Sequence, residues 1–454
     1  MINHTFLLQS THARAEGDFP ASYGGVSIDS RTLRRGDIFF AIKGDSDGHD
    51  HVRAAFEAGA AAAVVENGAR SLPEAPLIFV PSTVRALADM AAEWRKKLKN
   101  SKIVCITGSS GKTTTKQALA GILSAAGRSA VASRKSFNNH LGLPLTLLET
   151  DAEHEVCVAE VGINTPGEMD ELERIARPDI GAVVNIGTAH IGRFGSKEKI
   201  AREKSRLFRS FGKQCGFAIN LDDPLTVEIA SALDCDKAGF SARNTSAEVA
   251  AADIVCSSRS VSFKMKIRGR EFPVTAPVAG AHNVMNFLCA SALGLLLGLS
   301  PDEIAGGIGN FTPAEMRMQV YEVLDGVVLI NDCYNANPDS VAAALEELGR
   351  LKKSGGRAIA VLGDMLELGD LSGQYHYEAG EKAARCGVDI LIAFGEEARH
   401  IRAGAGDGVR VEKTVSHEEA ADIIKSVVRR GDFILIKGSR AMAMEKIARM
   451  IGGR

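Results

Sequence analysis

The sequence predicts an α/β protein built from three domains. The chain has 454 residues, which corresponds to about three domains of roughly 150 residues each. Hydrophobic residues make up 45% of the chain and charged residues 24%, a globular composition that excludes intrinsic disorder. Apolar strand patterns alternate with helix patterns, which indicates parallel sheets joined by crossover helices. We place the domains at residues 1–98, 99–313 and 314–454.

The first domain is expected to hold short strands between alanine-rich helices. Each strand is a brief apolar run, and the last stretch of the domain is basic and favours a helix. The expected strands are 37–42, 61–65 and 77–80, and the expected helices are 52–58 and 84–99.

The central domain opens with an apolar strand at 102–107, and a helix follows it. Strand and helix patterns then alternate, which favours a parallel sheet. Between about 216 and 278 the pattern changes to short strands, before a long helical run. The expected elements are the strands 102–107, 155–161, 180–186, 261–267 and 272–278 and the helices 114–123 and 283–297.

In the third domain the alternation of strand and helix restarts. This pattern is typical of a doubly wound sheet, which binds ligands at the carboxyl ends of its strands. The expected strands are 327–331, 358–362, 389–394 and 433–437, and the expected helices are 340–352, 418–428 and 442–450.

Charge and cysteine usage exclude several classes of protein. Lys and Arg number 54 against 56 Asp and Glu, so no general positive field favours nucleic acid or an anionic membrane. The eight cysteines form no C-x-x-C pair, which indicates a reduced chain without a structural metal site. The sequence contains neither a signal-peptide pattern nor an apolar run of about 20 residues. We therefore expect a cytoplasmic protein that binds no nucleic acid and does not insert into a membrane.

The clearest chemical motif is the turn Thr107-Gly-Ser-Ser-Gly-Lys-Thr113 between the strand 102–107 and a helix. Such a turn directs backbone N–H groups and a helix N-terminus at one point, which suits the phosphates of ATP. Lys112 is expected to reach the β- and γ-phosphates, and the Thr113 hydroxyl to bind Mg²⁺. The motif is a variant, because the usual first glycine falls on Ile106. The expected nucleotide-binding residues here are Gly108, Ser109, Ser110, Gly111, Lys112, Thr113 and Thr114.

Two later strands end in further candidate ligands for Mg²⁺. Glu160 lies at the end of the strand 155–161, and His190 follows the strand 180–186. With the Thr113 hydroxyl, these side chains suit one or two Mg²⁺ ions beside a triphosphate. The alternative is that neither residue binds a metal, since a glutamate at a strand end is usually a solvated or capping residue and a lone histidine is usually packed or on the surface.

Several blocks occur in the order found in the Mur ligases of peptidoglycan synthesis, which this chain resembles along nearly its whole length. The blocks are Thr107–Thr114, Ser136–Leu148, Glu160–Asn164, His190 with Phe194–Ser196, and His282–Asn283. Three more resemble the branch that adds D-alanyl-D-alanine to a UDP-MurNAc-tripeptide: Asp332–Pro338, Leu362–Gly369 and Lys437–Arg440.

The resemblance implies a three-domain Mur ligase architecture. The first domain binds the UDP-muramoyl substrate, the central P-loop domain binds ATP, and the doubly wound, Rossmann-like third domain binds the incoming dipeptide. The implied reaction is ATP-dependent amide ligation through an acyl phosphate, with ATP and Mg²⁺ as cofactors. The implied partners are the small molecules UDP-MurNAc-tripeptide and D-alanyl-D-alanine, and we expect a monomer.

The resemblance also implies roles for residues that local patterns do not single out. Lys204 resembles the lysine that is carbamylated in Mur ligases and binds a second Mg²⁺ together with Glu160 and His190. Without the resemblance, this segment is the solvated face of a charged helix, and Lys197 and Lys199 are alternatives. The implied catalytic residues are Lys112, Lys204, His190 and Arg317.

Arg317 resembles the arginine that reaches the γ-phosphate when the third domain closes. The family commonly has a glycine directly before this arginine, and this chain has Met316 there.

Further contacts with nucleotide and substrates are implied in the same way. Asn283 and Asn337 resemble residues near the adenine, and Asp332 resembles the acid that binds the ribose; Asn337 is also a good helix N-cap. The implied substrate residues are Ser30, Arg31, Asp47 and His49 for the uridine diphosphate, Asn138 and Asn139, and Asp364, Lys437, Ser439 and Arg440 for the dipeptide. Loop and capping chemistry is the alternative for most of them.

Other functions remain open from the sequence. One is a different ligase of the same fold, similar to folylpolyglutamate synthase, and another is a P-loop regulatory protein that hydrolyses ATP slowly. A dinucleotide-dependent oxidoreductase is weaker, since Gly306-Gly-Ile-Gly309 lacks the third glycine of that motif.

Overall fold

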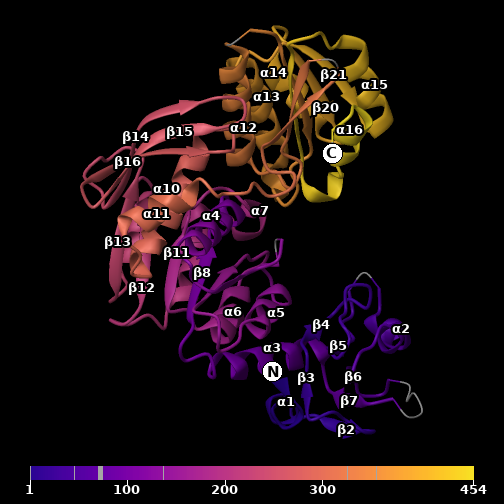
Figure 1. The fold of residues 1–454 in the computed structure, drawn as a ribbon. Coiled ribbons are helices and arrows are strands. Elements are labelled where there is room, and N and C mark those ends of the chain that lie inside the picture. The colour runs from indigo at the N-terminus through magenta and orange to yellow at the C-terminus, as the bar shows by residue number, and fades with distance from the viewer. Residues whose placement is uncertain are drawn as a thin grey trace.

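The computed structural model describes residues 2–44, 46–69, 75–135, 137–324, 326–353 and 355–453. Ser136, in one of the blocks named above, lies outside this set. Three layered α/β units follow one another along the chain, and the first and last lie at opposite ends of the central one (Figure 1). The predicted fold class is confirmed. In the part of the chain that the structure describes, no helix is long and apolar enough to cross a bilayer.

The first unit is a five-stranded sheet in the order β2-β7-β6-β5-β4. Alternate residues of β5 pack on opposite faces: Ile38 and Phe40 contact the cluster around α1 and α3, and Phe39 contacts the cluster around α2. The elements are β1 (Ile2–Asn3), α1 (His4–Thr11), β2 (Arg14–Glu16), β3 (Ser22–Tyr23), β4 (Val26–Ser27), β5 (Ile38–Phe40), η1 (Gly48–His51), α2 (Val52–Glu57), β6 (Ala62–Glu66), β7 (Leu77–Val80) and α3 (Thr83–Arg95).

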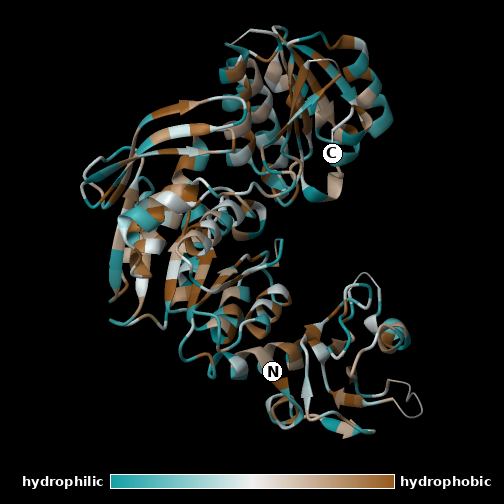
Figure 2. Cartoon of the chain, viewed as in Figure 1, coloured by the Kyte–Doolittle hydropathy of each residue, from teal (hydrophilic) through white to brown (hydrophobic). Residues whose placement is uncertain are grey.

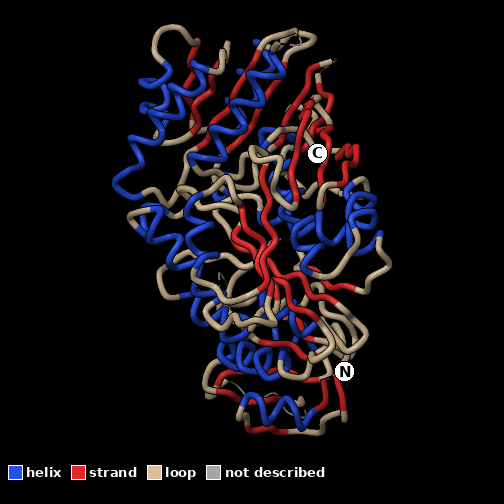
Figure 3. Tube along the Cα trace, turned by 90° about the vertical axis from the view of Figure 1, so that its left-hand side faces the viewer, coloured by secondary structure: helices blue, strands red, loops and turns tan. Residues whose placement is uncertain are grey.

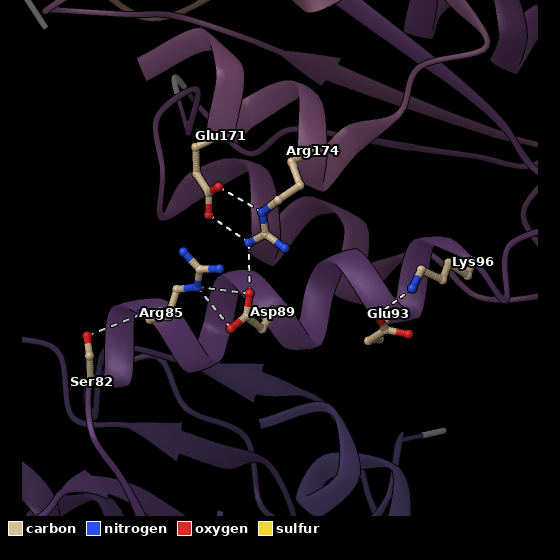
Figure 4. A network of polar contacts seen from close by, with 7 residues as sticks. All are labelled: Ser82, Arg85, Asp89, Glu93, Lys96, Glu171 and Arg174. Carbon is tan, nitrogen blue, oxygen red and sulfur yellow. Dashed lines mark hydrogen bonds and ion pairs between the residues drawn. The ribbon is translucent and has the colours of Figure 1, made fainter. Parts of the chain in front are cut away.

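Helix α3 fastens the first unit to the central one. The Trp94 indole donates a hydrogen bond to the Thr150 carbonyl at 2.8 Å. Asp89 on α3 accepts from Arg174 on α6 at 2.8 Å, and Glu171 holds the same guanidinium (Figure 4). An indole hydrogen bond and a network of charged side chains therefore connect α3 to the central unit.

The central unit is a nine-stranded sheet in the order β16-β15-β14-β13-β12-β11-β8-β10-β9. It is parallel from β9 to β14, and β14, β15 and β16 form an antiparallel extension. The elements are β8 (Lys102–Thr107), α4 (Lys112–Ala125), β9 (Ala130–Ala132), α5 (Gly142–Glu149), β10 (Val156–Glu160), α6 (Glu168–Ala176), β11 (Ile180–Val183), α7 (Ile191–Phe194), α8 (Lys197–Ser205), η2 (Arg206–Phe208), β12 (Gly216–Asn220), α9 (Pro224–Ser231), β13 (Asp236–Ser241), β14 (Val249–Cys256), β15 (Val261–Ile267), β16 (Arg270–Ala276), α10 (His282–Leu296) and α11 (Pro301–Ile308).

Helices cover this sheet as the crossover pattern predicts. Helices α4, α10 and α11 pack against one another, and α5 packs against α6 and α3. Figure 3 shows twisted strands in the middle of the molecule with helices on both sides of them.

The third unit is a six-stranded sheet in the order β17-β18-β22-β19-β20-β21, parallel except for the edge strand β17. Both faces of its strands are buried: Leu435 packs with α12 to α14, and its neighbours Ile434 and Ile436 pack with α15 and α16. The elements are β17 (Gln319–Val323), β18 (Val327–Asn331), α12 (Pro338–Lys352), β19 (Ala358–Gly363), η3 (Gly369–Leu371), α13 (Ser372–Arg385), β20 (Ile390–Phe394), α14 (Ala398–Ala405), β21 (Arg410–Thr414), α15 (His417–Val427), β22 (Phe433–Lys437), η4 (Arg440–Met442) and α16 (Glu445–Met450).

Hydropathy follows this layering. Figure 2 shows the strands of the third unit mainly in the hydrophobic colour, between helices that alternate between the two colours. The doubly wound arrangement predicted for this unit is confirmed. The expected helix at 442–450 is shorter, since a 3-10 turn (η4) precedes α16.

Candidate functional site

The candidate site lies where the strand order of the central sheet reverses. Strand β8 lies between β10 and β11. The chain after β8 continues to β9, on the β10 side, whereas the chain after β11 continues to β12, on the other side, so these two connections diverge. A crevice opens at such a point, and ligands bind there in α/β sheets. The turn after β8, Glu160 at the end of β10, and the loop after β11 all reach this crevice.

The turn after β8 depends on two glycines in the left-handed region, Gly108 at φ +148° and Gly111 at φ +80°. A Cβ at Gly111 would lie 2.1 Å from the Asn286 side-chain oxygen, so this position has no room for a side chain. The Lys112 ammonium donates to the Gly108 carbonyl at 2.8 Å. Residues 107–113, which we call the phosphate turn, therefore form the tight glycine turn before a helix that the sequence predicts, and phosphate binding there stays a prediction.

Glu160 forms the acidic centre of the crevice. Its side chain is buried, and its Oε2 accepts a hydrogen bond from the Thr113 hydroxyl at 2.8 Å. Its Oε1 accepts from the Asn138 amide at 2.9 Å. Two residues that the sequence places on separate segments as Mg²⁺ ligands, Thr113 and Glu160, therefore lie in contact.

Sequence reasoning missed Lys116, which is only 2% exposed. Its ammonium lies 3.5 Å from Glu160 Oε2 and donates to the carbonyls of Ser133 and Lys135. The available signal was a lysine one helical turn after Lys112, on the face of α4 that also carries buried apolar residues.

Nearby cations decide the charge of Glu160. Burial by itself would raise the pKa of this carboxyl, but Lys116, Lys112 and Arg317 outweigh burial and lower the pKa below its usual value. Burial lowers the pKa of Lys116, and Glu160 opposes that shift. Glu160 is therefore an ionised carboxylate held by cations, the form that binds Mg²⁺.

We expect Lys116→Met to destabilise the protein by about 3 kcal/mol, because it leaves the buried Glu160 carboxylate without its counterion. Guanidinium unfolding monitored by circular dichroism measures the change. Lys135→Met, at an exposed position, is the control and should change stability by less than about 0.5 kcal/mol. Unfolding of the Lys116 variant at the wild-type midpoint would contradict the counterion role.

Lys204 is 1% exposed, although it lies on a helix rich in charges. Its ammonium is 3.2 Å from the Gly108 carbonyl, directly beside the phosphate turn. Burial, with a contribution from the nearby Lys112, lowers its pKa well below the usual value, which favours the neutral amine. The two alternatives, Lys197 and Lys199, are exposed on the same helix.

His190 lies at the N-terminus of α7 with φ +63°. Its Nδ1 is 2.5 Å from Glu367 Oε2, on the third unit. The same loop is bound by Asp339, which accepts from the Thr188 backbone and hydroxyl at 2.6 Å. The third unit therefore docks directly on the loop that carries His190.

A cavity of about 1040 Å³ extends from the phosphate turn to the third unit. Its volume and its mixture of polar side chains are suited to a nucleotide with a second ligand. The predicted residues that line it are Ser109, Ser110, Gly111, Lys112, Thr113, Thr114, Asn138, Glu160, His190, Asn283, Arg317, Asp332, Asn337, Lys437, Ser439 and Arg440.

Arg317 enters this cavity from the segment that joins the central and third units. Its guanidinium carbon lies 4.2 Å from the centre of the Tyr334 ring, a cation–π contact. Met316, where the family commonly has glycine, adopts φ +56°. Met316 thus adopts the left-handed conformation that favours glycine, and its side chain is flexible and has no branch at Cβ.

Lys437 and Asp332 form one buried ion pair at 2.6 Å, although the sequence assigns them to different ligands. Lys437 also donates to the Asn335 carbonyl at 2.9 Å, and Asp332 accepts from the Met318 backbone at 3.1 Å. The pair therefore ties the joining segment to the end of β22.

The other third-unit candidates also have structural partners. The Asp364 carboxylate accepts two backbone N–H groups in the turn before α14, and burial raises its pKa. The Ser439 hydroxyl accepts a backbone N–H from the loop after β19 at 2.8 Å. Arg440 pairs with Glu445 at 3.0 Å and has a half-exposed side chain, so it is the most accessible cation of this group.

Three of the candidate asparagines make hydrogen bonds to backbone groups at or near the start of a helix. Asn337 caps α12 and forms a capping box with Ser340. Asn139 accepts two backbone N–H groups at the start of α5. Asn283 is buried and binds the Ala279 carbonyl at 2.8 Å. The N-cap alternative for Asn337 is confirmed, and its side chain still lines the cavity.

The four candidates of the first unit lie outside the lining of this cavity. Arg31 is exposed and pairs with Asp29 at 2.7 Å, and Ser30 is half-buried beside it. Asp47 accepts from His49 Nδ1 at 2.6 Å, and His49 Nε2 accepts the backbone N–H of Glu66 at 2.9 Å. Arg31 is thus more exposed than Asp47 and His49.

The donors in the crevice fit Mg²⁺ bound together with phosphates. Among the described residues, no three His, Cys, Asp or Glu side chains converge into a metal cage. Mg²⁺ usually takes one or two carboxylates, with phosphate and water oxygens completing its shell. The Thr113 hydroxyl and the ionised Glu160 provide such a partial set beside a phosphate turn.

Comparisons with known proteins cover most of the chain. Family profiles described as "Mur ligase family, catalytic domain", "Mur ligase middle domain" and "Mur ligase, glutamate ligase domain" match residues 22–95, 106–294 and 316–440. A relative from Bacillus subtilis (strain 168), UDP-N-acetylmuramoyl-tripeptide--D-alanyl-D-alanine ligase, is 34% identical over 94% of this chain and 92% of its own length. The Escherichia coli (strain K12) protein of the same name is 31% identical over 94% and 93%.

Solved structures are similar over the same extent. MurF from Acinetobacter baumannii matches with a TM-score of 0.87 and 32% identity, covering 99% of this chain and 98% of that one. MurF ligase from Thermotoga maritima in complex with ADP matches with a TM-score of 0.80 and 28% identity, covering 94% and 96%.

Proposed function

The chain belongs to the Mur ligase family, and on that premise we propose that it joins D-alanyl-D-alanine to UDP-N-acetylmuramoyl-tripeptide. The reaction is an ATP-dependent amide ligation of peptidoglycan synthesis, which produces ADP and phosphate. One observation carries the proposal: the phosphate turn, the Thr113–Glu160 pair and the docked third unit share one cavity. The match to ligases of this name extends over both sides of that cavity.

The chemistry has two steps. The terminal carboxylate of the tripeptide attacks the γ-phosphorus of ATP, and the bond to the bridging oxygen breaks to give an acyl phosphate and ADP. The dipeptide amine then attacks the acyl carbon, loses a proton, and phosphate leaves from the tetrahedral intermediate. Both reactants of the first step are anions, so fixed positive charge is the main requirement of the site. Lys112 and Arg317 are the cations that we assign to it.

Mg²⁺ would be held by Thr113 and Glu160, and when bound it neutralises charge on the phosphates. We assign His190 and a carbamylated Lys204 to a second Mg²⁺ site. A neutral amine adds to CO₂ through a new N–C bond and releases a proton, which converts the lysine into an anionic carbamate. Burial beside the phosphate turn, with a lowered pKa, supports this assignment for Lys204.

The tripeptide substrate is proposed to extend from the first unit, 1–98, to the crevice of the central unit, 99–313. Strand β4, just before Ser30 and Arg31, packs against α5, whose start is capped by Asn139. The path from a diphosphate at Arg31 to Glu160 therefore passes Asn138 and Asn139. We also propose that Asp47 and His49, in the first unit, contact the uridine diphosphate.

The dipeptide is proposed to bind the third unit, 314–454, at the turn after β22. Arg440 is the accessible cation there, with Ser439 beside it, and Lys437, which pairs with Asp332, lines the same cavity. Asp364 shapes this turn, because its carbonyl accepts the Ser439 N–H at 3.1 Å. Asn283, Asn337 and Asp332 line the same cavity, and we propose that they contact the nucleotide, the two asparagines near the adenine and Asp332 at the ribose.

Substrate dependence tests the proposed function. Purified protein with ATP, Mg²⁺ and UDP-MurNAc-tripeptide should release phosphate only when D-alanyl-D-alanine is added, and mass spectrometry should detect the pentapeptide product. L-alanyl-L-alanine is the matched control and should release little phosphate. Phosphate release that ignores the dipeptide would indicate a regulatory ATPase, and release that requires glutamate and a folate would indicate a folylpolyglutamate synthase-like ligase. Either result contradicts the proposal.

We further propose that the enzyme acts as a monomer, since one chain supplies both sides of the cavity. Because the reaction consumes ATP and a UDP-linked precursor, we propose that it takes place in the bacterial cytoplasm.

A further inference from the structure

Glu367 of the third unit contacts the candidate metal ligand His190 across the interface with the central unit. Its Oε2 lies 2.5 Å from His190 Nδ1, and its Oε1 lies 3.3 Å from an Arg193 guanidinium nitrogen. Its backbone carbonyl accepts the Gly192 N–H at 3.2 Å. Glu367 itself has φ +66°, so the loop after β19 holds it in an uncommon conformation against this partner.

The close approach of the two units depends on glycines. A Cβ at Gly192 would lie 2.3 Å from the Leu368 carbonyl carbon, and one at Gly187 would lie 2.4 Å from the Asp339 carboxylate. Gly192, in α7, meets backbone of the third unit and accepts it only because it has no side chain, whereas a side chain at Gly187, in the loop after β11, would require the Asp339 carboxylate to move. The contact between Glu367 and His190 exists as a consequence of this docking.

The contact determines which ring nitrogen of His190 is available. The Glu367 carboxylate accepts a hydrogen bond from Nδ1–H, and in the neutral ring with its proton on Nδ1 the other nitrogen, Nε2, has a free lone pair. His190 lines the cavity, and no described residue makes a hydrogen bond to its Nε2. A carboxylate behind a metal-binding histidine is a recurring arrangement, because it fixes both the tautomer and the orientation of the ring.

We propose that Glu367 is a positioning residue that holds His190 with Nε2 free to bind Mg²⁺, so that docking of the third unit completes the metal site. The inference rests on the proposed function, since it takes His190 as a ligand of Mg²⁺. Residue spacing does not indicate that Glu367 and His190 act together, because Glu367 lies 177 positions after His190. The central unit alone does not indicate it either, because Glu367 belongs to the third unit.

Three variants separate positioning from simple docking. Glu367→Ala removes the acceptor, whereas Glu367→Gln keeps an oxygen that accepts from Nδ1–H and loses only the charge. Arg193→Gln removes the ion pair with Glu367 and leaves the His190 contact intact. The probe is Mn²⁺, titrated by electron paramagnetic resonance into the full-length protein with saturating ADP and no peptide substrate.

We expect Glu367→Ala to weaken Mn²⁺ binding by about 10-fold or more. Glu367→Gln and Arg193→Gln should weaken it by less than about fivefold, the effect of an exposed ion pair. Equal affinity in all proteins would overturn the proposal. So would tighter binding in Glu367→Ala, which would make Glu367 a competitor of the metal, or equal losses in all three variants, which would make it a docking charge.

The ring can also be observed directly. Long-range proton–nitrogen spectra of protein labelled on its histidines should show His190 with a proton on Nδ1, its signal assigned by its loss in His190→Gln. Glu367→Ala should change this signal to a mixture of tautomers, and Glu367→Gln should restore it. An unchanged ring signal in Glu367→Ala would overturn the proposal. Neither measurement uses substrate, so a failure of the proposed ligase activity would appear separately, in the phosphate-release assay.

Discussion

Lys112→Ala is expected to reduce D-alanyl-D-alanine-dependent phosphate release by about 10³-fold or more. The ammonium at the start of α4 is the cation closest to the phosphate turn, since it donates to the Gly108 carbonyl at 2.8 Å. Its removal leaves the charge that develops on the transferring phosphoryl group without its main protein partner, and losses of this size follow in other phosphate sites. A factor of 10³ corresponds to about 4 kcal/mol of transition-state stabilisation.

The measurement is kcat and KM for ATP from a coupled ADP assay, with ADP affinity from calorimetry. Lys102→Ala is the matched control, because Lys102 is exposed at the start of β8 and precedes the same turn. A Lys112→Ala enzyme with near-wild-type kcat would exclude the proposed role of this lysine, whatever its effect on KM.

Lys204→Ala is expected to cause a loss of similar size, about 10³-fold, for a different reason. The alanine removes the proposed carbamate, so one anionic ligand of the second metal is lost together with the geometry that it imposes. Because the side chain is buried beside the Gly108 carbonyl, its removal leaves a space that a small anion can enter. Formate or acetate should therefore restore part of the activity of this variant and none of that of Lys112→Ala.

Lys199→Ala, on the same helix with an exposed side chain, should keep near-wild-type activity. Thermal melting of each variant verifies that the fold is intact. Full activity of Lys204→Ala, or rescue that does not depend on the carboxylate concentration, would contradict the carbamate assignment.

Much of the fold was predictable because local patterns are strong where strands are buried on both faces, or where they alternate between buried and more exposed residues, as 261–267 does. The predicted strands at 102–107, 261–267, 327–331 and 433–437 have the observed bounds. Helices α13 and α14 were missed, since their buried faces consist mainly of alanine, glycine and histidine and contain few large apolar residues. The glycines in these two helices permit close packing: a Cβ at Gly404 would lie 1.8 Å from the Tyr377 carbonyl oxygen.

The sequence by itself determined the α/β class, the glycine turn at 107–113, the position of Glu160 at a strand end, and that of His190 in the segment that follows the next strand. These features are local, because glycine placement and apolar periodicity act over a few residues. Only the tertiary structure showed that Lys116 neutralises Glu160, that Lys204 is buried, that Lys437 pairs with Asp332, and that Glu367 reaches His190. Three of these findings are contacts between side chains that are distant in the sequence, and the fourth is the burial of a charged-type side chain, Lys204, in the interior. Sheet order and domain docking decide such contacts, and neither is encoded in residue spacing.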